Sequence, residues 1–165
     1  MNEIAGVVGI DVAKRKFDVA LLIHNKIKSK VFDNTPTGHK DFVEWLKKRG
    51  ATLDQTYLCM KATGSYSEIL ATSLVLGGWQ VSVVNPARIK GFSQSELARN
   101  KTDRADAALL ARFCAAMRPS LWTPPPAAWR ELHGWVDRLQ ALKDMHQQES
   151  NRMEAHLASG QTGMV

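Results

Sequence analysis

Three aspartates in this sequence have the surroundings and spacing of metal-binding carboxylates. Asp11 interrupts the apolar run "AGVVGIDVA", where a buried carboxylate is costly unless it coordinates something. Asp103 and Asp106 in "KTDRADA" are three residues apart and share one face of a helix. Taken alone, this pair is better explained as first-turn acids aligned with the helix dipole, but Asp11 shifts the balance toward a site. Carboxylate oxygens at a strand end suit Mg²⁺ or Mn²⁺, and two such ions are the usual means of cleaving a phosphodiester.

A lysine stands where a further carboxylate is expected. The apolar run "TYLCMK" ends at Lys61, and the "TGSY" that follows predicts a turn into a helix. The end of a strand before such a turn is a common position for a catalytic acid. Thr63 and Gly64 are expected to shape the turn, and Tyr66 is as well suited to capping the core as to contacting a substrate.

The order of the predicted elements explains how these residues come together. Strands are predicted at 5–13, 16–23, 26–34, 56–61 and 79–85, and helices at 35–50, 65–78 and 103–117. Two-residue linkers join the first three strands into an antiparallel meander, whereas the later strands alternate with helices and are expected to pair in parallel. The polar segment 87–103 is expected to be part helix and part loop.

This order is that of the ribonuclease-H fold, an α/β fold with a mixed five-stranded sheet flanked by helices. In that topology the first strand lies beside the fourth. Asp11 and Lys61 are therefore expected to be neighbours across the sheet.

The C-terminal part of the chain has a different character. We expect one domain over residues 1–118, a proline-rich linker over 119–128, a long helix over 129–159 and a disordered tail over 160–165. An apolar heptad seam in the long helix favours dimerisation, and it fades beyond residue 145. The seam residues are Leu132, Trp135, Leu139 and Leu142.

Basic residues precede and overlap the helical aspartates. They are Arg88, Lys90, Arg99, Lys101 and Arg104. Contacts to nucleic-acid phosphates and a flexible solvated loop explain this stretch equally well. The net charge of +6 is compatible with a polyanionic partner, although a lysine-rich solvated surface explains the charge better when it is taken alone.

Composition excludes several classes of protein. Hydrophobic residues make up 44% of the chain, which is ordinary for a globular domain. We find no run near the roughly 18 to 20 apolar residues of a membrane span, and no signal-peptide pattern at the N-terminus. Cys59 and Cys114 lie in apolar segments, which fits reduced thiols in a cytosolic protein. The absence of a CxxC or His/Cys cluster argues against a zinc site.

Four segments together resemble one family. They are "GIDVAK", "TGSY", "VVNPARIKGFSQS" and "KTDRADAALLARF". Over nearly all of residues 6–157 the chain is similar to the IS one-ten insertion-sequence transposases, the group that includes the Piv and MooV DNA invertases. The resemblance implies an N-terminal domain similar to the Holliday-junction resolvase RuvC, with a D-E-D-D set of Mg²⁺ or Mn²⁺ ligands. The first, third and fourth ligands fall on Asp11, Asp103 and Asp106, and the second, a Glu in the family, falls on Lys61.

The resemblance also implies partners and further parts. A C-terminal domain with a nucleophilic serine follows a coiled-coil linker in the family, and this chain is expected to end within that linker. Family members are implied to bind DNA and a structured guide (bridge) RNA and to form homodimers or higher oligomers. The implied location is the cytoplasm of a prokaryote, in association with the nucleoid.

Lys61 is expected to weaken or abolish metal binding. At about 4 Å and an effective dielectric near 20, one pair of unit charges is worth roughly 4 kcal/mol, and repulsion from a dication is roughly twice that. We expect Lys61 to take the place of an ion and to pair with Asp11 and Asp103. The substitution is open to explanation as natural decay or as deliberate inactivation. If metal binds nevertheless, Glu68 is the nearest acid in sequence that could complete the ligand set.

Three functions follow from these observations. The first is a transposase domain that is inactive by itself, and the second is an inactive nucleic-acid-binding and dimerisation module that binds no metal. The third is a sugar-kinase or actin-type ATPase. It ranks last, because "VAK" follows "GID" where a phosphate loop needs Gly-Thr or Gly-Ser.

Overall fold

The computed structural model describes residues 4–95 and 103–160, and for residues 103–105 it describes the backbone alone. The chain divides into two compact units, residues 1–124 and residues 125–165. Within the described ranges, no helix is both long enough and apolar enough to cross a membrane.

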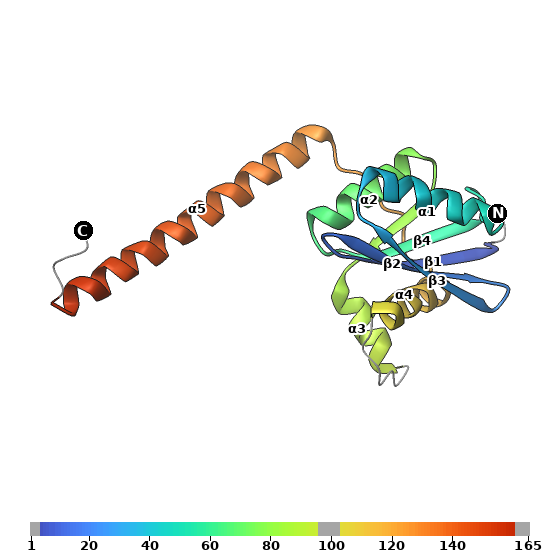
Figure 1. The fold of residues 1–165 in the computed structure, drawn as a ribbon, viewed down its shortest axis with the longest axis horizontal. Coiled ribbons are helices and arrows are strands. Elements are labelled where there is room, and N and C mark those ends of the chain that lie inside the picture. The colour runs from blue at the N-terminus through green and yellow to red at the C-terminus, as the bar shows by residue number, and fades with distance from the viewer. Residues whose placement is uncertain (1–3, 96–102, 161–165) are drawn as a thin grey trace. The chain divides into compact units, whose positions relative to one another are not determined.

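One mixed sheet forms the centre of the first unit (Figure 1). Its strands are β1 (Gly6–Val12), β2 (Lys16–Ile23), β3 (Lys26–Asp33), β4 (Thr56–Lys61) and β5 (Gln80–Val84). Their order across the sheet is β3-β2-β1-β4-β5. The β1–β2 and β2–β3 pairs are antiparallel, and β4 is parallel to both β1 and β5. The predicted meander and the adjacency of the first and fourth strands are confirmed, and with them the ribonuclease-H-like (RuvC-like) fold.

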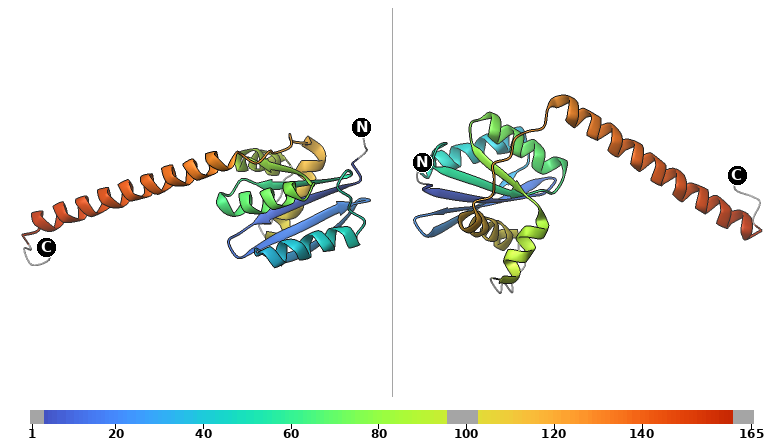
Figure 2. Two further views of the ribbon diagram at one scale, coloured as in Figure 1. Left: turned by 90° about the horizontal axis from the view of Figure 1, so that it is seen from above. Right: turned by 180° about the vertical axis from the view of Figure 1, so that it is seen from behind.

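Helices cover both faces of this sheet (Figures 1 and 2). On one face lie α1 (Pro36–Lys48) and α2 (Ser65–Leu76), and on the other lie α3 (Pro86–Ser95) and α4 (Asp103–Met117). The segment predicted as part helix and part loop is helical as far as Ser95, and its remainder to residue 102 lies outside the described residues.

The core is built differently on the two faces of the sheet, and on the second face α4 meets β2 through small residues and the other strands through larger ones. Toward α1 and α2, aliphatic residues of the strands pack with the large aromatic residues Phe17, Phe32, Phe42 and Trp45. Toward α4, the contact with β2 is made by the small residues Ala20, Ala107 and Ala111. Small side chains allow a helix to lie close to a sheet, so α4 comes nearer to the strands than a helix bearing leucines at these positions would.

Local sequence signals account for the element ends. His24 and Asn25 both have positive φ, 49° and 60°, as the two central residues of a type I′ hairpin turn require. Thr35 caps α1 through its Oγ1, which accepts a hydrogen bond of 3.0 Å from the Gly38 amide. At the other end Gly50 has a φ of 83° and closes a Schellman motif in which the Ala51 amide donates to the Leu46 carbonyl.

The segment after α4 is bound to the edge of the sheet. The Trp122 amide donates to the Val81 carbonyl at 2.7 Å. The buried hydroxyls of Tyr57 and Ser82 both donate to the Pro119 carbonyl, and burial raises the pKa of Tyr57, which keeps its proton in place for this bond. The first residues of the proline-rich segment therefore belong to the packed first unit.

The second unit contains one continuous helix, α5 (Ala127–Ala158), of 32 residues. All of it lies in the described part of the chain, and none of its residues is buried. Its heptad-seam side chains are between 45% and 66% exposed, the set being Leu132, Trp135, Leu139 and Leu142.

Candidate active site

A close approach of α4 to β1 sets the position of the candidate site. A Cβ on Gly9 would lie 2.0 Å from the Ala107 carbonyl oxygen and 2.4 Å from the Ala111 amide nitrogen, so only glycine fits. Asp11 is two residues further along β1 and therefore faces the same helix. Asp106 directly precedes Ala107 in α4. The missing side chain at Gly9 thus brings the two aspartates toward each other.

Lys61 joins them from the neighbouring strand. β1 and β4 pair in parallel with Ile10 opposite Met60, which sets Asp11 and Lys61 side by side at the carboxyl ends of their strands. Lys61 Nζ lies 3.3 Å from Asp11 Oδ1 and 3.9 Å from Asp106 Oδ2. The side chains are 22%, 18% and 38% exposed respectively, so the cluster opens to solvent. The expected pairing of Lys61 with Asp11 is present, and Lys61 also lies near Asp106; the expected pairing with Asp103 falls on a side chain outside the described ones.

The structure describes only some of the other residues predicted for the site, namely Asp103 and the basic residues. Asp103 and Arg104 occupy the first turn of α4, but their side chains lie outside the description, as do Arg99 and Lys101 altogether. The two basic residues of α3 are exposed, and the Arg88 guanidinium lies 5.7 Å from the centre of the Phe113 ring. The exposed Lys90 is two residues further along the same helix.

Asp18 is a candidate that the sequence interpretation missed. It lies directly opposite Asp11 in the antiparallel β1–β2 register and faces α4. Its residue is only 8% exposed, and its Oδ2 lies 3.8 Å from Lys16 Nζ. Strand alternation does place Asp18 on the same face as Ala20 and Leu22, which is a signal available from the sequence. Glu68, the acid suggested to complete the ligand set, is exposed on α2, which covers the opposite face.

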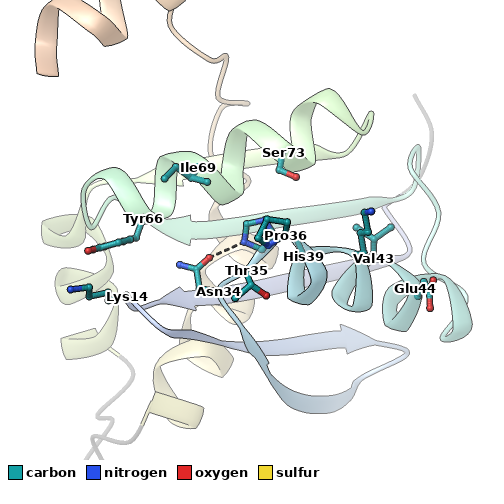
Figure 3. Close-up of a pocket in the computed structure, with 11 residues that line it drawn as sticks. Lys14, Asn34, Thr35, Pro36, His39, Val43, Glu44, Tyr66, Ile69 and Ser73 are labelled. Atoms are coloured by element: carbon teal, nitrogen blue, oxygen red, sulfur yellow. Dashed lines mark hydrogen bonds between the residues drawn. The ribbon is translucent and has the colours of Figure 1, made fainter.

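Hydrogen bonds hold the loops that follow Asp11 and Lys61. Thr63 Oγ1 donates to the Val12 carbonyl at 3.5 Å, which links the two loops to each other. Asn34 Nδ2 donates to the Ala13 carbonyl at 2.9 Å, so its Oδ1, 2.8 Å from His39 Nε2, must accept from that nitrogen. Burial lowers the pKa of His39 and favours its neutral form. Figure 3 shows the pair at the start of α1.

Comparison with known families decides the class of this site. A family model described as a transposase, of the IS one-ten type with a DEDD motif, matches residues 8–160. The chain belongs to the IS one-ten DEDD transposase family. The resemblance carried by "GIDVAK" and "KTDRADA" is thereby confirmed.

Two relatives of this transposase chain are proteins that invert a pilin gene. The pilin gene-inverting proteins of Moraxella bovis and Moraxella lacunata are each 33% identical to it over 148 residues, which is 90% of the chain and 46% of the relative. The chain therefore spans less than half the length of these relatives.

Solved structures with a similar fold include the RuvC of T. thermophilus in complex with a Holliday junction substrate. It is 14% identical, with a TM-score of 0.48 over 68% of this chain and 95% of RuvC. A Bacteroides thetaiotaomicron protein with an actin-like ATPase fold is 19% identical, with a TM-score of 0.45 over 65% of this chain and 38% of that protein.

DEDD transposases depend on divalent metal ions as a class. The question for this site is therefore whether its side chains could bind such an ion. In the described ranges, no three side chains of His, Cys, Asp or Glu are grouped closely enough to hold a metal ion. The ammonium of Lys61 contacts carboxylate oxygens of both Asp11 and Asp106, the oxygens that a dication would need. Within the described side chains, the carboxylates of Asp11 and Asp106 therefore face the ammonium of Lys61.

Proposed function

We propose that this chain is the N-terminal RuvC-like domain of an insertion-sequence transposase, together with the start of its coiled-coil helix, and that Lys61 leaves it without metal-dependent activity of its own. The observation that carries the proposal is the 3.3 Å contact between Lys61 Nζ and Asp11 Oδ1. The proposed parts of the chain are a domain over 1–118, a linker over 119–128 whose first residues pack on that domain, and a long helix over 129–159.

Electrostatics supports the loss of metal binding. Asp11, Asp103 and Asp106 are the three acids of the motif, and Lys61 stands in place of the Glu. A change from −1 to +1 beside a dication replaces attraction by repulsion, and each unit pair at about 4 Å is worth roughly 4 kcal/mol at an effective dielectric near 20. Since the Lys61 side chain is 22% exposed, water screens only part of this effect.

DNA is the proposed macromolecular substrate. The pilin gene-inverting relatives and the junction-bound RuvC are, by their names, proteins that act on DNA. In this chain the phosphate contacts fall to the basic residues before and within the first turn of α4. They are Arg88, Lys90, Arg99, Lys101 and Arg104. Recognition of a guide RNA belongs to the same proposal, as does the prokaryotic cytoplasm as the place of action.

Self-association through α5 completes the proposal. The exposed heptad seam of α5 buries apolar area when two copies pair along it, as in a coiled coil. A homodimer, or a higher homo-oligomer built from dimers, is the expected assembly.

A second candidate function follows from the ion pair itself. In an inactive nucleic-acid-binding and dimerisation module, Lys61 stabilises the fold in the absence of metal. Such a module binds DNA and self-associates but gains nothing from restoring a carboxylate at position 61. Metal affinity of a restored variant therefore separates the two functions.

Calorimetric titration with Mn²⁺ tests the proposal. The unmodified chain should show weak or no binding, and Lys61→Glu should gain affinity because it supplies a carboxylate beside Asp11. Lys61→Gln is the matched control, since it removes the positive charge without adding a charged ligand and should gain much less. Tight binding of two Mn²⁺ ions by the unmodified chain would overturn the account of Lys61. Equal affinities of Lys61→Glu and Lys61→Gln would favour the inactive module.

A further inference from the structure

We propose that an open groove between α1 and α2, on the face of the sheet opposite α4, binds an unpaired nucleotide of a single nucleic-acid strand. The groove has a volume of about 730 Å³ and is lined by both helices and by the loop after β1. Its principal residues are Lys14, Asn34, His39, Lys40, Tyr66 and Ile69. The proposal rests on the proposed function, because it names a further contact for the same class of substrate.

The groove combines an apolar lining with cations. Tyr66 and Ile69 on the first turns of α2 are 39% and 60% exposed and line the groove. Lys14 lies at the same end of the groove as Tyr66, whereas Glu44 lies toward the other end (Figure 3). An aromatic face beside an ammonium matches the two halves of a nucleotide, its base and its phosphate.

The backbone that carries Lys14 is held in place before any ligand arrives. The side-chain Nδ2 of Asn34 donates to the Ala13 carbonyl at 2.9 Å, and the backbone N–H of Asn34 donates to the Arg15 carbonyl at 2.8 Å. The residues on both sides of Lys14 are therefore fixed, and His39 holds Asn34 in turn. A preformed loop loses less conformational entropy on binding than a free one.

The position of the groove favours a nucleic-acid strand over other occupants. Lys14 is three residues beyond Asp11 in the loop after β1, and Tyr66 is five residues beyond Lys61 at the start of α2. The groove therefore lies on the face of the sheet opposite α4, and it begins at the same edge, where β1 and β4 end. A strand held by Tyr66 has its neighbouring phosphates near this edge. The competing occupant is an apolar helix face, such as the seam of α5 from a second copy, and the test below distinguishes it.

The probe is a 12-nucleotide single-stranded DNA that contains one 2-aminopurine. Fluorescence anisotropy measures its binding to the protein, and quenching of the 2-aminopurine reports stacking of that base. A duplex of the same sequence is titrated in parallel. Stacking of one base on an aromatic ring predicts a loss of about tenfold in single-strand affinity for Tyr66→Ala, with loss of the quenching. Tyr66→Phe should keep both the single-strand affinity and the quenching.

Lys14→Ala should lower the slope of log affinity against log salt by about 0.7. Controls are Leu76→Ala, an exposed apolar residue on α2, and Lys47→Ala, an exposed lysine on α1, which should change neither measurement.

The outcomes separate the groove from the proposed function. If Tyr66→Ala binds the single strand like the unmodified chain, or if the chain binds duplex but no single strand, the groove proposal is wrong and the proposed function stands. If neither form of DNA is bound, both proposals fail. If Tyr66→Ala changes self-association and leaves strand binding intact, the groove receives a helix of a second copy, and the nucleotide proposal is overturned.

Discussion

Gly9 lies against the backbone of Ala107 so closely that a single methyl group would separate α4 from β1. We therefore predict that Gly9→Ala lowers the free energy of unfolding by about 2 kcal/mol or more, because the helix must shift to make room. Gly6→Ala in the same strand is the control, since its Cβ would meet nothing closer than 3.8 Å. Urea denaturation of both variants checks the difference, and equal midpoints would contradict the close approach.

The ion pair of Lys61 with Asp11 should appear as an energetic coupling. Lys61→Met and Asp11→Asn are each expected to destabilise the domain by about 1–3 kcal/mol, because each removes the 3.3 Å contact between two side chains that are only 22% and 18% exposed. The double variant should lose less than the sum of the two. Denaturant unfolding of the four proteins measures the coupling. Lys47→Met, which removes an exposed lysine, should have little effect, and strict additivity of the two site variants would refute the pair.

His39 should make the stability depend on pH in one direction. Burial lowers its pKa below the ordinary value of 6.5, so between the two values the unfolded chain binds a proton that the folded chain does not. The free energy of unfolding is therefore full above pH 6.5 and falls as the pH drops toward the lower, folded pKa. His39→Gln, which still offers Asn34 a donor, should flatten this decline, and the exposed His146→Gln should leave it unchanged. Thermal melts from pH 7.5 to 5 provide the comparison.

Tyr57 should show that the segment after α4 is part of the first unit. Tyr57→Phe removes a buried donor to the Pro119 carbonyl and should lower the free energy of unfolding by about 1–2 kcal/mol. It should also speed proteolytic cleavage near residues 119–126. The only other tyrosine is partly exposed, so Tyr66→Phe is a matched control that should change neither property. Unaltered cleavage of Tyr57→Phe would contradict the role of this bond.

The seam of α5 should control the oligomeric state. Trp135→Asp places a charge in the apolar stripe and should shift the chain toward monomer in light scattering across a concentration series. Gln148→Asp adds the same charge away from the seam and should leave the assembly as it was. A chain that is monomeric throughout, with or without Trp135→Asp, would sink the dimer proposal.

Connection rules made most of the fold predictable. The order of strands and helices in the sequence, with the handedness of crossovers, leaves few ways to build the sheet, and the neighbourhood of Asp11 and Lys61 follows from that order. Their exact partners did not follow. Whether Lys61 reaches Asp106 depends on the distance between α4 and β1. Gly9 sets that distance, and its role cannot be predicted without knowing which part of α4 packs against it.

Long-range pairing explains what the sequence did not reveal. Asp18 lies opposite Asp11 because of the register between β1 and β2. Strand alternation predicts which face a side chain is on, but it does not predict which residue of the next strand lies opposite. The prolines of residues 119–128 predict an extended linker. In the structure Trp122 instead pairs with β5, using a hydrogen-bonding edge that no local pattern describes.

The attachment of residues 119–122 to the sheet has a mechanical consequence. Any tension applied to the chain beyond residue 124 is borne first by the bonds of Trp122 to Val81 and of Pro119 to Tyr57 and Ser82. Tyr57 lies four residues before Lys61 in the same strand. A pull on the C-terminal helix would therefore load the strand that ends in the candidate site before it reached any other part of the sheet except β5.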